Sequence, residues 1–294
     1  MKKLVLFFVV IISVFSFAIN FHNPLGPTLL PAAQMFIERP DNINLNYWRT
    51  LDEAQVLMIR EQTDAIVLPV AFGINMIEKG VKYQLAGVSL WKTFFLVSSI
   101  ELETLEDLNG KRILTLHGPG QTADLVLKML KNEKDLNFEI IYLSAAAEIV
   151  QLLASNKENI AVLPEPFVSL AGVRTQGKVR TYFDMQEIYA DLTGLSPSMP
   201  ISGLFLRSTL NENDKKYFIK LYENSANFYF NNYFDNAVNF VFNAMGGNMP
   251  EAVLKMAANN SEIYFKHDKE IIVEYLNILK EYDLINNYDD SFFY

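Results

Sequence analysis

The chain has 294 residues, and its 25 Lys and Arg against 34 Asp and Glu give a formal net charge of −9 at pH 7. An acidic chain without a cluster of basic residues is a poor candidate for binding nucleic acid or an anionic membrane surface. The sequence contains no Cys, which excludes disulfides, thiolate metal sites, Cys nucleophiles and lipid attachment through a Cys.

The first eighteen residues have the pattern of a secretory signal peptide. Lys2 and Lys3 precede an apolar run at 4–12, and Ser16-Phe17-Ala18 is a small-x-small cleavage site. The run is too short to span a bilayer comfortably. We therefore expect export to the periplasm or the extracellular face, not as a lipoprotein. The mature chain would begin at Ile19, and losing both lysines takes its net charge from −9 to −11.

Short strands alternate with helices through the first two hundred residues. Thr50 and Glu53 form a capping-box pattern that opens a helix through Arg60. After Asn211, apolar residues recur at helical spacing, which predicts a mostly helical C-terminal part. The alternation predicts an α/β chain with largely parallel sheets flanked by helices on both faces. The expected strands are 19–21, 43–47, 65–68, 83–88, 94–98, 111–116, 140–143, 160–163, 179–184 and 201–207.

A Gly-Pro-Gly loop follows the strand at 111–116. The helix after it has Ala123, Val126, Leu127 and Leu130 at helical spacing. Backbone N–H groups at the start of such a helix suit an anionic or strongly polar ligand, with Gln121 and Thr122 as the nearest side chains. The third Gly of a G-x-G-x-x-G motif is missing, which makes dinucleotide binding a minor alternative. A similar strand–Gly/Pro–helix unit occurs at 21–38 and suggests two similar lobes.

No catalytic motif is evident. His22, His117 and His267 lie far apart and match no metal-binding pattern, and G-x-S-x-G and Walker A motifs are absent. Glu165 ends an apolar strand between two prolines, so it is either an exposed acid in a turn or an acceptor that faces a ligand. A lone carboxylate without a base or a metal favours binding over catalysis. The sequence indicates no cofactor.

Several of these segments resemble one family when taken in order. Leu108-Asn109-Gly110-Lys111-Arg112-Ile113 resembles the D-L-x-G-K-x-I segment of bacterial extracytoplasmic solute-binding proteins, and the Gly118 to Asp124 stretch is similar to their glycine loop. Pro164-Glu165-Pro166 resembles the E-P segment of the branch that binds sulfonates, taurine, nitrate and hydroxymethylpyrimidine. Thr63-Asp64-Ala65-Ile66 is similar to the x-x-D-A/I run of the first lobe. The resemblance covers nearly the whole mature chain.

The resemblance implies a two-lobed type II periplasmic binding protein. Lobe I would comprise residues 19–98 and 207–294, and lobe II residues 99–206, with hinges near 97–101 and 204–208. A small solute such as a sulfonate or a pyrimidine-like compound would bind between the lobes, close them, and pass to an ABC transporter permease. The protein would be a monomer and not an enzyme. The alternatives are a module that feeds a membrane sensor and an enzyme on the same fold.

Candidate ligand contacts can be carried over from the family onto matching positions. For each of them an ordinary turn or core role is the alternative, and for Trp91 a packed rim position is as good a reading as a stacking wall. The first-lobe loop offers no Arg or Lys, so only Lys92 or Arg207 could pair with an anion, and Glu165 would repel one. Aromatic residues near strand ends, including Phe72 and Phe167, favour an apolar or ring-bearing ligand with one polar end. The candidate contacts are Gly26, Pro27, Thr28, Pro69, Ser89, Trp91, Gln121, Thr122, Glu165, Tyr189 and Ser202.

Overall fold

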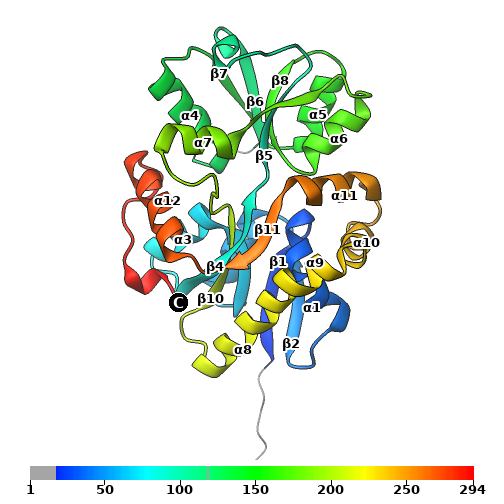
Figure 1. Ribbon diagram of the computed structural model, residues 1–294. Helices are drawn as coiled ribbons and strands as arrows, with labels where there is room; N and C mark the ends of the chain where they lie inside the picture. Colours follow the sequence, from blue (N-terminus) through cyan, green and yellow to red (C-terminus); the bar gives the residue numbers. More distant parts are fainter. Residues whose placement is uncertain (1–17, 117, 119) are drawn as a thin grey trace, which may run out of the picture.

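Two β-sheets, one above the other in Figure 1, organise the chain into two lobes. The computed structural model describes residues 18–294 except 117 and 119, so residues 1–17 of the expected signal peptide lie outside the described part. The six-stranded sheet of lobe I has the order β11-β4-β10-β3-β1-β2. Its strands are β1 (Ile19–Pro24), β2 (Ile43–Trp48), β3 (Ala65–Pro69), β4 (Tyr83–Lys92), β10 (Ser202–Arg207) and β11 (Glu262–Lys266).

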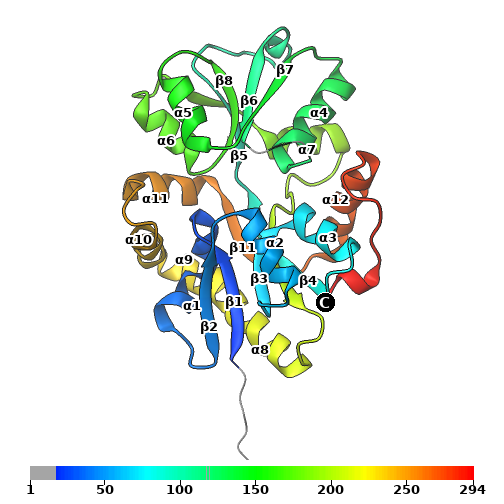
Figure 2. The same cartoon turned by 180° about the vertical axis from the view of Figure 1, so that it is seen from behind.

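The sheet of lobe II has five strands in the order β7-β6-β8-β5-β9. Its strands are β5 (Phe94–Ser98), β6 (Arg112–Leu116), β7 (Glu139–Leu143), β8 (Ile160–Pro164) and β9 (Arg180–Asp184). The helices of this lobe cover both faces of the sheet (Figures 1 and 2). They are η2 (Leu105–Leu108), α4 (Thr122–Lys134), α5 (Ala146–Ala154), α6 (Phe167–Arg174) and α7 (Met185–Thr193).

The helices of lobe I come from both ends of the chain. Those of the N-terminal half are η1 (Pro27–Ala32), α1 (Ala33–Glu38), α2 (Leu51–Ile59) and α3 (Val70–Glu78). Those of the C-terminal part are α8 (Glu212–Glu223), the π-helical turn η3 (Asn224–Tyr229), α9 (Phe230–Asn232), α10 (Phe234–Ala244), α11 (Glu251–Asn260), α12 (Lys269–Glu281) and η4 (Asp290–Phe292). The mostly helical C-terminal part is confirmed, although β11 was not expected there.

Both sheets are mixed, not largely parallel as the sequence predicts. In lobe I, β1 pairs in parallel with β2 and β3, while β10 and β11 run antiparallel to their neighbours. In lobe II, β6 pairs in parallel with β7 and β8, while β5 runs antiparallel to β8 and β9. The antiparallel pairs are made by β5 and β10, each the first strand after the chain crosses into its lobe, and by β11 of the C-terminal part.

A central strand shows how each sheet separates two apolar cores. Four consecutive residues of β3 are fully buried, and alternate side chains of a strand point to opposite faces. Ala65 and Val67 belong to one core, and Ile66 and Leu68 belong to the other. This continuous apolar run is therefore typical of a strand covered on both faces, as the sequence indicates.

The chain crosses between the lobes at Thr93 and again at 194–201. Strand β4 belongs to lobe I and β5 to lobe II, with Thr93 between them, so the first crossing is not near 97–101, where the resemblance implies a hinge. The second crossing precedes β10, which lies wholly in lobe I, and not within 204–208. The two crossings are joined by backbone hydrogen bonds from Met199 N to Trp91 O (3.2 Å) and from Ile201 N to Leu90 O (3.0 Å). The crossing segments therefore form a two-stranded connection. Among the described residues, no helix is long and apolar enough to cross a membrane.

Candidate functional site

The carboxyl ends of six parallel strands, three from each lobe, meet at one cavity. The ends of β1, β2 and β3 contribute Pro24, Trp48 and Pro69. The ends of β6 and β8 contribute Leu116 and Pro164, and Ser144 follows β7. The cavity has a volume of about 630 Å³, which is within the range for a small-molecule site. Ligands of open α/β sheets bind beyond the carboxyl ends of strands, so the topology alone makes this cavity the candidate site.

Eight of the predicted contacts line this cavity, and they come from both lobes. From lobe I they are Pro27, Thr28, Pro69, Ser89 and Ser202. From lobe II they are Gln121, Thr122 and Glu165. The fold thus brings together segments that are more than 170 residues apart in the sequence.

Three predicted contacts are placed outside the cavity lining. Gly26 precedes η1 and does not line the cavity, whereas the next two residues do. Trp91 is fully buried; its ring stacks on Tyr264 at 5.5 Å, and its indole N–H donates to the carbonyl of Tyr264 (3.0 Å). Tyr189 is also buried and packs edge-on against Tyr275 of α12, with ring centroids 6.3 Å apart. Trp91 therefore ties β4 to β11, and Tyr189 ties lobe II to α12 of lobe I.

Glu165 lies at the boundary between the lobes and is only 6% exposed. Its carboxylate accepts hydrogen bonds from the backbone N–H (3.1 Å) and the hydroxyl (2.9 Å) of Ser169 in α6. It also accepts one from Nδ2 of Asn260, at the end of α11 in lobe I (2.7 Å). The negative charge sits at the N-terminus of α6, where the helix dipole favours it. Glu165 thus caps a helix, bridges the lobes and lines the cavity.

Two buried serines are among the polar residues that lobe I contributes to the cavity wall. Ser89 accepts a hydrogen bond from the phenol of Tyr222 (3.0 Å), and Ser202 donates one to the carbonyl of Leu68 (3.2 Å). Gly203, next to Ser202, has space for no side chain, because a Cβ there would lie 2.7 Å from Leu85 Cδ1 and 2.9 Å from Gly87 O. Close contact between β4 and β10 therefore fixes where both hydroxyls lie.

The N-terminus of α4 forms part of the wall from lobe II. Gln121, Thr122 and Ala123 line the cavity, and within the described part of the chain no side-chain hydrogen bond caps the helix at Gln121. The carboxylate of Asp124 lies just below, 1% exposed, and accepts from Gly120 N (2.7 Å), Tyr142 Oη (2.6 Å) and Lys128 Nζ (2.9 Å). Burial, together with this hydrogen bond, raises the pKa of Tyr142 to about 12. The first turn of α4 therefore presents backbone N–H groups, but a nearby carboxylate already offsets part of their positive field.

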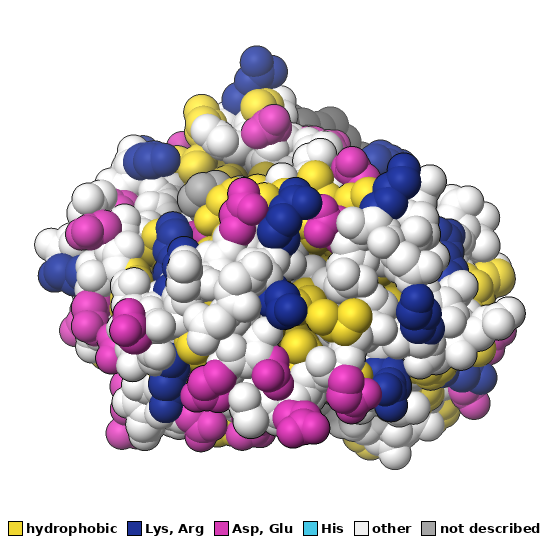
Figure 3. Space-filling view, turned by 90° about the horizontal axis from the view of Figure 1, so that it is seen from above, with side chains coloured by type: hydrophobic (Ala, Val, Ile, Leu, Met, Phe, Trp, Pro, Cys, Tyr) yellow, Lys and Arg dark blue, Asp and Glu magenta, His cyan; other side chains and the backbone are white. Residues whose placement is uncertain are grey.

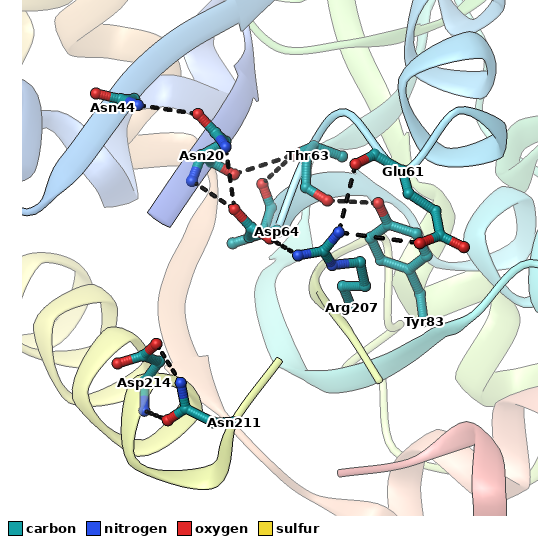
Figure 4. A network of polar contacts seen from close by, with 10 residues as sticks. Asn20, Asn44, Glu61, Thr63, Asp64, Tyr83, Arg207, Asn211 and Asp214 are labelled. Atoms are coloured by element: carbon teal, nitrogen blue, oxygen red, sulfur yellow. Dashed lines mark hydrogen bonds and ion pairs between the residues drawn. The ribbon is translucent and has the colours of Figure 1, made fainter. Parts of the chain in front are cut away.

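The two cations that the sequence analysis considered for an anion are engaged elsewhere. Arg207 pairs with the buried Asp64 (2.5 Å), which also accepts from the backbone and side chain of Asn20 (Figure 4). This network lies at the amino ends of β1 and β3, the edge of the sheet opposite the cavity. Lys92 pairs with Asp184 across the crossing segments. Neither residue lines the cavity.

Sequence reasoning missed the cavity residues that follow β2. Arg49, Thr50 and Asp52 line the cavity at the start of α2, and Trp48 at the end of the strand supplies an aromatic wall. The N-cap half of the expected capping box is confirmed, because Thr50 accepts from Glu53 N (3.2 Å). The Glu53 carboxylate accepts from Arg49 N (2.8 Å) and not from Thr50 N, so the reciprocal half differs from the box. The Thr50 pattern directly follows the expected strand at 43–47 and so marks the carboxyl end of that strand. Because ligands of α/β sheets bind beyond such ends, the sequence pattern could have identified these residues as well.

The charges around the cavity are few and of both signs. Arg49, Asp52 and Glu165 are its only charged lining residues in the described part of the chain, and most of the remaining wall is apolar. No group of three or more His, Cys, Asp or Glu among the described residues could hold a metal ion. On the face seen from above lobe II, basic and acidic side chains are interspersed (Figure 3). The cavity therefore suits a largely apolar small molecule with a polar end.

No protein-family model matches the sequence, and no curated protein sequence matches it. Solved structures do match over nearly the whole chain. An ABC transporter from Parabacteroides distasonis is 23% identical, with a TM-score of 0.79 over 95% of this chain and 99% of that chain. The ligand-binding component of an ABC-type import system from Staphylococcus aureus, with zinc bound, is 15% identical (TM-score 0.70; 94% and 96% covered).

The periplasmic aliphatic sulphonate binding protein of Escherichia coli is 14% identical and has a TM-score of 0.74, with 94% of this chain and 90% of that chain covered. Matches at this level of identity establish architecture. Together with the two sheets and the cavity between them, they show that the chain has the two-lobed α/β fold of periplasmic binding proteins.

Proposed function

We propose that this protein is an exported solute-binding protein that captures a small molecule between its lobes and delivers it to an ABC importer. The observation that carries the proposal is the meeting of six strand ends from two sheets at one cavity of about 630 Å³. Two structural neighbours support the same reading, one named as the ligand-binding component of an ABC-type import system and one as a periplasmic aliphatic sulphonate binding protein. The signal-peptide pattern before Ile19 supports export.

The chemistry of the cavity favours binding over catalysis. The hydroxyls of Ser89 and Ser202 bond to a phenol and to a backbone carbonyl, not to a general base. Within the described ranges, neither His nor Lys lines the cavity. A hydroxyl without a base within reach is a weak nucleophile at neutral pH. We therefore favour reversible capture by a monomer over turnover.

The connection between the lobes is suited to hinge motion. Within the described residues, only two segments cross between the lobes. The Gln186 side chain holds the first by accepting from Thr93 N (2.9 Å) and Phe94 N (3.0 Å) and donating to Phe94 O (2.7 Å). The other contacts between lobes lie at the sides of the cavity, where α11 meets α6 and α12 meets α7 (Figure 1). We infer that solute binding stabilises this arrangement and that release opens it at Thr93 and 194–201.

An uptake experiment tests the delivery step. The solute that co-purifies with the natively prepared protein is identified by mass spectrometry of a denatured extract. Its uptake is then measured in cells with and without the gene. We expect uptake to fall at least tenfold without the gene and to return when the gene is restored. Unchanged uptake of a solute that the protein binds would contradict delivery and would favour a sensor role.

A further inference from the structure

Residues behind the cavity wall determine whether the Ser89 and Ser202 hydroxyls present a hydrogen-bond donor or an acceptor to the cavity. Ser89 is 1% exposed and Ser202 is 5% exposed, and both line the cavity. On the paired strands, Ser202 lies opposite Leu90 and Gly203 lies opposite Val88, so Ser89 is the extra residue of a β-bulge. A bulge re-aims a side chain and is frequent beside binding sites.

Tyr222 determines which way the Ser89 hydroxyl can point. The Tyr222 ring is fully buried and packs edge-on against Phe21 (6.0 Å) and Phe265 (5.2 Å). Its phenol has one hydrogen bond in the described part of the chain, to Ser89 Oγ at 3.0 Å. Burial raises the pKa of Tyr222, so the phenol keeps its proton. A buried O–H without another acceptor must donate to Ser89, which leaves the proton of Ser89 for the cavity.

Ser202 presents a hydrogen-bond acceptor to the cavity, where Ser89 presents a donor. Its hydroxyl donates to the carbonyl of Leu68 (3.2 Å), so its proton is already used. The remaining oxygen lone pairs can accept a hydrogen bond from a ligand. Ser89 is therefore a donor toward the cavity and Ser202 is an acceptor, on neighbouring strands of one sheet.

We propose that Ser89 and Ser202 select a neutral ligand group that carries a hydrogen-bond acceptor beside an N–H donor, such as a carboxamide or a lactam. Tyr222 is a positioning residue that enforces this polarity without touching the ligand. The inference rests on the proposed function, because it concerns the solute held in that cavity. A ligand carboxylate would face the lone pairs of Ser202, in a cavity where the negative charges of Asp52 and Glu165 outnumber the positive charge of Arg49. An ammonium group would leave the proton of Ser89 unpaired.

Three probes of one shape test this polarity. In the side chain, indole-3-acetamide offers both an acceptor and a donor, indole-3-acetate offers acceptors only, and tryptamine offers donors only, while the ring N–H is common to all three. The indole ring suits the apolar walls at Trp48 and Phe94. Affinities are measured by titration calorimetry with the mature chain and with Ser89→Ala and Tyr222→Phe. Tyr83→Phe is the matched control, since Tyr83 is another buried tyrosine and donates to Thr63 O (2.6 Å) at the far edge of the sheet.

We expect the amide to bind about tenfold more tightly than either other probe, the effect of one or two hydrogen bonds. Ser89→Ala should weaken the amide about fivefold and leave tryptamine unchanged. Tyr222→Phe frees the Ser89 oxygen to accept as well as to donate, so the preference for amide over amine should fall about fivefold. A purely structural role for Tyr222 would instead weaken all probes equally, and Tyr83→Phe should keep the preference of the wild type.

Three results would overturn the inference. They are equal binding of acetate and acetamide, an unchanged amide preference in Tyr222→Phe, and binding of none of the three probes. If the co-purifying solute is taken up by the cell but lacks a paired acceptor and donor, this inference fails while the proposed function stands. If no solute is bound or transported, the proposed function itself fails.

Discussion

The carboxylate of Glu165 in lobe II accepts a hydrogen bond of 2.7 Å from Nδ2 of Asn260 in lobe I. The two residues are 95 positions apart in the sequence, and this bond joins the lobes beside the cavity. Glu165 is buried and, among the described residues, has no cation within ion-pair distance. Each hydrogen bond to its charge therefore matters more than an exposed contact would.

Replacing Asn260 by Ala should weaken the contact between the lobes. The variant leaves one side of a buried carboxylate without its donor, which we expect to lower the free energy of unfolding by about 1–3 kcal/mol. Small-angle scattering should also report a larger radius of gyration. Urea unfolding measures the first effect. Asn259→Ala, on the same helix, is the matched control and should stay within about 0.5 kcal/mol of the wild type. Equal unfolding free energies and equal radii of gyration for the two variants would contradict the bridging role of Glu165.

Replacing Arg207 by Met should destabilise the fold without changing solute affinity. The variant leaves Asp64, whose side chain is 8% exposed, without its cation, and we expect a loss of about 1–3 kcal/mol in urea unfolding. Arg180→Met removes an ion pair with Glu101 in which both side chains are more than half exposed. That control should cost less than about 1 kcal/mol. A solute that binds more weakly to the Arg207 variant alone would contradict the separation between this network and the cavity.

Stability should depend on pH through His22. Burial lowers the pKa of His22 below its ordinary value of 6.5, and the charges of Glu53 and Asp64 offset this only in part. As the pH falls below about 6.5, the unfolded chain binds a proton at this position before the folded chain does. The neutral His22 thus contributes stability that is complete above this pH and is lost as the pH falls toward the folded value.

The measurement is the unfolding free energy of wild type and His22→Gln between about pH 5 and pH 8. The wild type should lose more stability on acidification than the variant does. Parallel curves for the two proteins would show that His22 does not titrate differently in the folded state.

The sequence predicts the cavity best where strands end in recognisable turns. Pro27, Pro69, Gln121 and Glu165 all follow short apolar strands, and parallel strand ends meet by geometry, so local patterns suffice to bring them together. The α/β class follows from the alternation of strands and helices, whereas the two-lobed arrangement is what the resemblance to solute-binding proteins implies. Local patterns do not predict the direction of a strand that lies outside a βαβ unit. The antiparallel strands β5, β10 and β11 are the examples in this fold.

The surroundings of several residues depend on partners distant in the chain, which local patterns do not predict. Trp91 belongs to a strand longer than expected, and its partner Tyr264 lies in β11, a strand not expected in the mostly helical C-terminal part. Arg207 could be excluded from the site only by knowing that Asp64 lies opposite to it at the far edge of the sheet. The role of Tyr222 behind Ser89 likewise depends on a contact across 133 positions.

Cavity-blocking variants test the central claim most directly. A library of small solutes is screened by thermal shift against the mature wild type and against Gln121→Trp and Ser261→Trp, which fill the cavity from opposite lobes. A ligand at about 100 times its Kd should stabilise the wild type by about 2.7 kcal/mol, since it binds only the folded state. We predict that solutes which stabilise the wild type leave both blocked variants unchanged, while the variants unfold near the wild-type temperature without solute. Equal stabilisation of all three proteins, or stabilisation of none by any solute, would contradict capture between the lobes.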